Sequence, residues 1–215
     1  GQASKAIYGK TPRDIKEAIG RNLGINSVVN FAVVFAMKDA LQAHVEPVII
    51  ERYSDAFLLA PKLFQRLRKS AVKSKSIDIA ITEQTLAFGL LGIFLLCHKE
   101  AEQHSFVLHA IAGIEELESL NSHVKACAHL SLFSASTLML SLWHIDAVVI
   151  KQLTHLDRVT GQMTKRSEQD ELILFMLTCL YQHAVGRGFT DGVFEKAELL
   201  GIADFTDITT QVFNT

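Results

Sequence analysis

Residues 86–97 read LAFGLLGIFLLC, twelve consecutive positions without a charged or strongly hydrogen-bonding side chain. A helix that crosses a bilayer needs about 20 apolar residues, whereas twelve helical residues rise only about 18 Å. His98, Lys99 and Glu100 follow directly and end the apolar stretch. The length and the polar flank therefore predict a buried core helix and no membrane span.

The composition is typical of a folded, water-soluble chain. The 215 residues are 49% apolar and 20% charged, so a core can form without disulfides or metal. The formal net charge of −2 disfavours binding to nucleic acid, which needs a basic excess. Residues 1–20 carry no apolar signal-peptide core, and Cys97, Cys127 and Cys179 lie in apolar runs without a CxxC pair. We expect a cytoplasmic protein with buried, reduced thiols.

Apolar residues recur at helical spacing along the whole chain, and few segments alternate as strands do. The fold class is therefore predicted to be all-α, a multi-helix bundle of about nine or ten helices. The first expected helix runs from a Thr11 cap to Gly24, and the next two span 26–44 and 47–69, with a kink or break at Pro61. Thr82 is expected to cap the helix that contains the opening stretch, and further helices are expected at 104–119, 122–142 and 144–157. The last three run from a Ser167–Asp170 capping box to Gly186, from Thr190 to Gly201, and over 206–213.

Residues that could catalyse or bind metal do not form a motif. The chain has no phosphate-binding loop, no GxGxxG, no GxSxG and no HExxH. Nine histidines are scattered, and the pairs His104/His109 and His123/His129 have spacings that do not share one helix face. We therefore predict no catalytic residue, no metal ligand and no cofactor.

The sharpest charge feature is a basic run between residues 62 and 75. Lys62, Arg66 and Lys69 are spaced so that they share one helix face. Such a face can bind a small anionic ligand or an acidic partner, and it can equally be a solvated helix surface. The same two interpretations apply to an acidic cluster, Glu115, Glu116 and Glu118.

A family resemblance rests on the order of several segments. DIKEAIGRNLGINSVVNFAVVFAM (14–37) contains an Ala-Ile pair followed by Leu-Gly, and AFGLLGIFLLC (87–97) contains Gly-Leu-Leu. SASTLMLSLWHIDAVVIKQLTHLD (134–157) contains the only tryptophan, Trp143, and LILFMLTCLYQHAVGRGFTDGVFEKAELLGI (172–202) closes with Leu-Gly. In this order the segments resemble HDOD domains, non-enzymatic relatives of the HD phosphohydrolases found in bacterial signalling proteins.

The resemblance implies one HD-like helical domain over residues 1–215, with an N-terminal helical portion at 1–60 and a core at 61–215. The family's front helices are largely absent from this sequence, which implies a short variant or a truncation. The His-Asp pair that holds metal in catalytic HD enzymes falls on Gly92 and Ile93, and a further histidine falls on Leu132. None of these three side chains can donate an electron pair to a metal ion. Gly89 and Gly92 are also expected to lie on one helix face and to allow close helix packing.

Three hypotheses about function follow. The preferred one is a non-enzymatic regulatory or scaffold module of bacterial signal transduction, which meets signalling proteins or fused signalling domains near residues 58–69 and can form a homodimer. The alternative is a divergent metal-dependent phosphohydrolase, a nucleotide or cyclic-dinucleotide phosphodiesterase using His123, His129, His155 and Asp157. The third is a helical adaptor unrelated to HD folds. HD ancestry requires the helices near 86–97 and 130–143 to pack together, and an unrelated adaptor does not.

Overall fold

The computed structural model describes residues 32, 35, 36, 38–71, 77–145, 147–160 and 165–213. The chain divides into two compact units, Gly1–Asp39 and Ala40–Thr215, and all helices labelled below belong to the second. The helix predicted from Thr11 to Gly24 lies outside the described residues, as does most of the one predicted at 26–44. Residues 38–41 of the latter are helical.

The described residues form ten helices and no strand, which confirms the predicted all-α multi-helix bundle. The helices are α4 (Pro47–Ala71), α5 (Ile79–Phe88), α6 (Gly92–Leu96), α7 (His104–Gly113), α8 (Leu117–Ala128), α9 (Leu132–Leu142), α10 (Ala147–Thr160), α11 (Glu168–Val185), α12 (Asp191–Leu199) and α13 (Phe205–Phe213).

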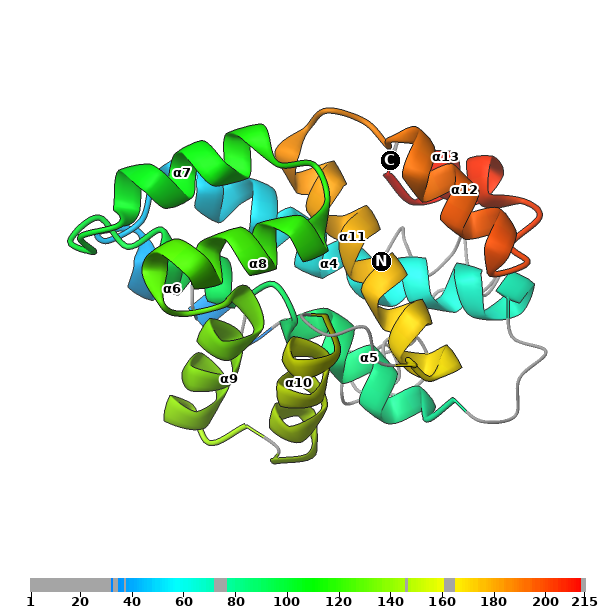
Figure 1. Ribbon diagram of the computed structural model, residues 1–215, viewed down its shortest axis with the longest axis horizontal. Coiled ribbons are helices and arrows are strands. Elements are labelled where there is room, and N and C mark those ends of the chain that lie inside the picture. The colour runs from blue at the N-terminus through cyan, green and yellow to red at the C-terminus, as the bar shows by residue number, and fades with distance from the viewer. Residues whose placement is uncertain are drawn as a thin grey trace, which may run out of the picture. The chain divides into compact units, whose positions relative to one another are not determined.

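The core of the second unit is organised around α11, most of whose residues are buried. This helix packs against α4, α5, α8 and α12, and α4 in turn contacts α5 and α13 (Figure 1). A second group consists of α6, α9 and α10, in which α9 contacts both of the other helices. The two groups meet where α10 contacts α5. The last residues of α5 are the first residues of the stretch LAFGLLGIFLLC.

The stretch LAFGLLGIFLLC is buried as predicted, but it is not one helix. Helix α5 ends at Phe88, and tighter bonds of the i to i+3 type carry the chain into α6, for example from the Leu91 amide to the Phe88 carbonyl at 3.2 Å. The wider window Ile79–Leu96 is apolar enough to cross a membrane by composition, but 67% of it is buried inside the protein.

Local capping chemistry explains why several helix ends agree with the prediction. Ser167 and Asp170 form the predicted capping box, and Gly186 ends α11 in the left-handed region at φ 79°. Helix α4 begins at Pro47 and passes through Pro61 without ending. Thr82 is a correction: Asp78 caps α5 by accepting a hydrogen bond of 3.0 Å from the Ile81 amide, and Thr82 lies inside the helix.

Two predicted helices are each divided in the structure. The segment 104–119 breaks between Gly113 and Leu117, and 122–142 breaks at His129, which adopts φ 56°. His129 occupies the left-handed position that usually favours glycine, so the sequence gives little warning of this break. The cysteine prediction is also corrected, because Cys97 and Cys179 are buried but Cys127 is exposed.

Candidate functional site

The helices α6 and α9 pack together, as the sequence analysis required of an HD-related fold. The contact centres on Gly92, the first residue of α6. A Cβ atom built on Gly92 would stand 2.2 Å from the carbonyl oxygen of Leu132 and 2.7 Å from the amide nitrogen of Ser136. The two backbones therefore meet at a distance that only glycine permits.

A buried hydroxyl group completes this junction. The Gly92 amide donates a hydrogen bond of 2.8 Å to Ser136 Oγ. That hydroxyl lies 2.9 Å from the carbonyl oxygen of Gly89 and 3.1 Å from that of Leu132, so it can donate to either. Because the first amides of a helix have no partner within the helix, Ser136 supplies the acceptor that α6 lacks at its start. We call Gly89, Gly92, Leu132 and Ser136 the α6–α9 junction.

The structure thus brings together the positions that the sequence analysis assigned to a lost metal site. Gly92, Ile93 and Leu132 are all buried, and the α6–α9 junction is filled by backbone atoms, aliphatic carbons and the Ser136 hydroxyl. The prediction for the two glycines needs a correction, since they serve different helices. A Cβ on Gly89 would meet Leu177 of α11 at 2.7 Å, whereas Gly92 faces α9.

Sequence reasoning missed Ser136. It lies in a run of small residues, Ser134-Ala135-Ser136, and nothing in that run shows which hydroxyl faces a glycine on another helix. The available signal is indirect: small residues on two helices that must pack closely can bring one hydroxyl against the partner's backbone.

In the alternative hypothesis, His123, His155 and Asp157 have separate partners, and His129 is exposed at the end of α8. His155 Nε2 lies 3.1 Å from Asp170 Oδ2, while His123 stacks on Phe106 with ring centroids 5.1 Å apart. Asp157 accepts hydrogen bonds from Asn121 at 3.1 Å and from Ser134 at 2.9 Å. Within the described part of the chain, no group of three or more His, Cys, Asp or Glu side chains is placed to hold a metal ion.

Asp157 forms a polar cluster with Asn121, Ser134 and Lys125, and it is a carboxylate there. Burial would raise its pKa, but hydrogen bonds from neighbouring side chains and the charge of Lys125 lower the pKa below its usual range. The cluster joins α8, α9 and α10, because Asn121 also accepts a hydrogen bond of 3.2 Å from the Phe133 amide. These contacts give Asp157 a role in helix packing.

The predicted basic face is only partly solvent-exposed. Lys62 is half-buried, and its Nζ donates a hydrogen bond of 3.4 Å to the carbonyl of Val212 in the last turn of α13. Burial, and then the charge of Arg66, lower the pKa of Lys62. Arg66 is exposed, and the side chain of Lys69 lies outside the described residues. The binding of an anion at this face stays a prediction.

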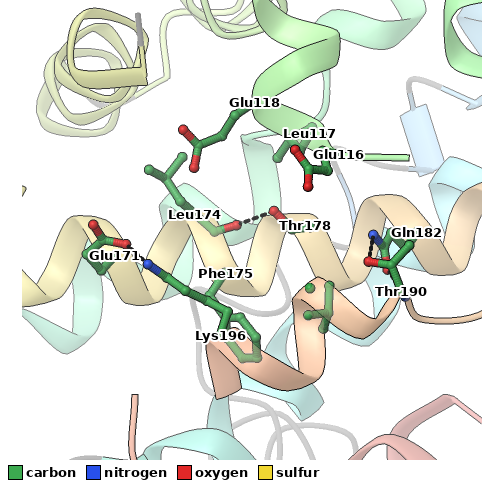
Figure 2. Close-up of a pocket in the computed structure, with 12 residues that line it drawn as sticks. Glu116, Leu117, Glu118, Glu171, Leu174, Phe175, Thr178, Gln182, Thr190 and Lys196 are labelled. Atoms are coloured by element: carbon green, nitrogen blue, oxygen red, sulfur yellow. Dashed lines mark hydrogen bonds and ion pairs between the residues drawn. The ribbon is translucent and has the colours of Figure 1, made fainter. Parts of the chain in front are cut away.

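A pocket of about 320 Å³ lies between the start of α8, α11 and α12. Its apolar surface includes Leu117, Leu174 and Phe175, and Figure 2 shows Lys196 of α12 reaching Glu171 of α11. Carboxylates at its edge are also paired: Arg166 Nη1 donates a hydrogen bond of 2.8 Å to Glu118 Oε1, and the second nitrogen of that guanidinium contacts Oε2.

Polar groups at the far end of this pocket are likewise bonded to each other. The Thr190 amide donates to Gln182 Oε1 at 3.0 Å, and Gln182 Nε2 donates to the Glu115 carbonyl at 3.1 Å. Two of the acidic residues predicted from the sequence pair with arginines, Glu118 with Arg166 and Glu115 with Arg187, whereas Glu116 accepts a hydrogen bond from Ser119. No nucleophile with a neighbouring base lines the pocket.

Comparison of the chain with models of protein families, with curated proteins and with solved structures gives no match. The resemblance to HDOD domains, drawn from the order of short motifs, stays a prediction.

Proposed function

We propose that this chain is a non-enzymatic regulatory or scaffold module of bacterial signal transduction, in which the metal-binding His-Asp pair of an HD phosphohydrolase has been lost. The observation that carries the proposal is the α6–α9 junction. Gly92 and Leu132, two positions that the motif comparison assigns to lost metal ligands, touch each other through backbone atoms.

Metal-dependent hydrolysis needs carboxylate and imidazole groups that converge on an ion and a water molecule. The α6–α9 junction has no space for such groups, since even one added carbon at position 92 would overlap the Leu132 carbonyl. Ile93 and Leu132 contribute only aliphatic side chains to the surrounding core. The proposed function is therefore the binding of partners, and its proposed place is the cytoplasm.

An exposed apolar surface supports a role in protein contacts. Leu142 is 68% exposed and Trp143 is 38% exposed at the end of α9, and Leu138 and Val148 are exposed nearby on α9 and α10. Solvent-exposed apolar side chains gathered at adjoining helix ends are typical of surfaces that meet other proteins. The partners would be signalling proteins, fused signalling domains or a second copy of the chain, with the Lys62, Arg66 and Lys69 face offering a site for a small anionic ligand.

An assay with manganese separates this proposal from the alternative of a divergent phosphodiesterase. We expect no hydrolysis of bis(p-nitrophenyl) phosphate or of a cyclic dinucleotide above the rate with manganese in buffer. Turnover by the purified chain that is lost in His123→Ala or Asp157→Asn would overturn the proposal. His123→Ala is the more informative variant, because His123 is exposed and its removal leaves the buried polar cluster intact.

A further inference from the structure

A second pocket of about 320 Å³ lies where α4, α7 and the end of α11 come together. Figure 1 shows this region around α7 and the upper end of α11. The apolar lining of the pocket comes from all three helices and includes Ile49, Leu108, Ile111, Ala184 and Val185. The pocket shares no lining residue with the pocket of Figure 2 or with the Lys62 face.

Two exposed arginines also line this pocket, Arg52 from α4 and Arg187 from the segment after α11. Arg52 Nη1 donates a hydrogen bond of 3.2 Å to the Val185 carbonyl, and Arg187 Nη1 lies 3.6 Å from Glu115 Oε1. A guanidinium carries five N–H groups, so these contacts use a minority of the donors. Paired arginines beside apolar surface suit a carboxylate, which can accept two parallel hydrogen bonds.

Tyr53 supplies an independent sign of a missing partner. It lines the same pocket and is 1% exposed, and its hydroxyl makes no hydrogen bond within the described part of the chain. The neighbouring Tyr181 is different, because its hydroxyl donates to the Ile114 carbonyl at 2.6 Å. A buried hydroxyl without a partner is costly, and native proteins rarely leave one in that state.

Tyr53 and Arg52 both line the pocket, and both carry hydrogen-bond donors. Burial raises the pKa of Tyr53 well above its usual value, and the positive charge of Arg52 acts in the opposite direction. Tyr53 therefore remains a neutral hydrogen-bond donor at pH 7. A donor hydroxyl and a guanidinium that line one pocket favour the same kind of partner, an oxygen atom that carries negative charge.

We propose that this pocket binds a small carboxylic acid with an apolar body, whose carboxylate accepts hydrogen bonds from Tyr53 and from the arginines at positions 52 and 187. The apolar body lies against Ile49, Leu108 and Ile111. This site does not depend on the proposed signalling function, and it adds a ligand class to the fold whether or not the HD resemblance holds.

Calorimetric titration of the full chain at pH 7 with three probes tests the proposal. Octanoate carries both the charge and the apolar body, octanamide lacks the charge, and acetate lacks the body. We expect octanoate to bind at least tenfold more tightly than either of the others. Equal binding of octanoate and octanamide, equal binding of octanoate and acetate, or no heat from octanoate at millimolar concentration would each overturn the assignment.

Variants locate the binding. Arg52→Gln, Arg187→Gln and Tyr53→Phe are each expected to weaken octanoate binding about tenfold, the loss that one charge-assisted hydrogen bond typically gives. Arg158→Gln changes an exposed arginine on α10, outside the pocket and outside the Lys62 face, and it should leave the affinity unchanged. Tyr53→Phe should not lower the melting temperature, since it removes an unpaired hydroxyl. Unchanged affinity in Tyr53→Phe would mean that water alone satisfies this hydroxyl, and it would refute the site.

Discussion

Gly92 and Leu132 touch through their backbones, so that a Cβ on Gly92 would stand 2.2 Å from the Leu132 carbonyl oxygen. The neighbouring atom belongs to the main chain of a packed helix and cannot rotate away as a side chain could. This contact joins α6 to α9, and it places two positions forty residues apart at the centre of one buried junction.

Gly92→Ala is therefore expected to lower the free energy of unfolding by about 2–3 kcal/mol, because one helix must move to admit the methyl group. Urea denaturation followed by circular dichroism measures this change. Gly113→Ala is the matched control, since nothing lies within 4 Å of a Cβ at the end of α7. The control should be neutral or stabilising by up to about 0.5 kcal/mol. A Gly92→Ala protein as stable as wild type would show that the helices can separate without cost.

Ser136→Ala tests the hydrogen bond at the same junction. The substitution leaves the Gly92 amide without its acceptor in a fully buried site, which typically costs about 1–3 kcal/mol. Ser141→Ala removes an exposed hydroxyl that bonds to the Thr137 carbonyl in the same helix, and it should change stability by less than about 0.5 kcal/mol. Equal effects of the two substitutions would contradict a special role for Ser136.

Helix ends that depend on local chemistry could be predicted from the sequence. The Ser167–Asp170 capping box and Gly186 act within one turn, so their residue types alone indicate the ends of α11. The division of the apolar stretch after Phe88 could not be predicted, because the apolar residues continue across it. His129 gave no signal either, since histidine seldom takes a left-handed backbone conformation.

The candidate sites depend on contacts between distant segments. Gly92 was predicted to allow close packing, but its partner Ser136 lies 44 residues away on another helix. The pocket beside Tyr53 joins residues from α4, α7 and the end of α11, and each of these segments looks unremarkable when it is considered alone. Short apolar motifs predict which segments form the core, whereas the arrangement of polar groups depends on how the helices pack.

Acid should weaken the contact between α10 and α11 through Asp170. Burial would raise the pKa of this carboxyl, but hydrogen bonds from the Ser167 hydroxyl, His155 and the Ser167 amide lower it. A lowered pKa in the folded state adds stability that is complete above the unfolded-state pKa, near 4, and is lost as the pH falls through the folded-state value.

Asp170→Asn should therefore be less stable than wild type at pH 7, and the difference should shrink as the pH falls toward 3. Ser167→Ala removes the cap and should cost about 0.5–2 kcal/mol at neutral pH. It should also reduce the acid dependence, because the bond from the Ser167 hydroxyl to the carboxyl is lost while the bond from the Ser167 amide stays. Denaturation midpoints between pH 3 and 7 measure both effects, and a difference for Asp170→Asn that does not vary with pH would refute this linkage.

His129→Gly should stabilise the fold. His129 is exposed and ends α8 at φ 56°, where a side chain is strained and glycine is not. A gain of about 0.5–1 kcal/mol is expected in urea denaturation. His109→Gly places the same change at an exposed position inside α7, where it should instead cost about 1 kcal/mol. A loss of stability in His129→Gly would mean that the imidazole makes a contact that offsets the strain.

The three cysteines should differ sharply in reactivity. Burial raises the pKa of Cys97 to about 12 and also raises that of Cys179, while Cys127 is exposed near the end of α8. Because the thiolate is the reactive form, Ellman's reagent should modify one thiol per native chain and three after denaturation. Cys127→Ser should abolish the native reaction, and Cys179→Ser should leave it unchanged in a chain that still folds. Rapid native modification of two or more thiols would show that the core around α6 or α11 opens readily.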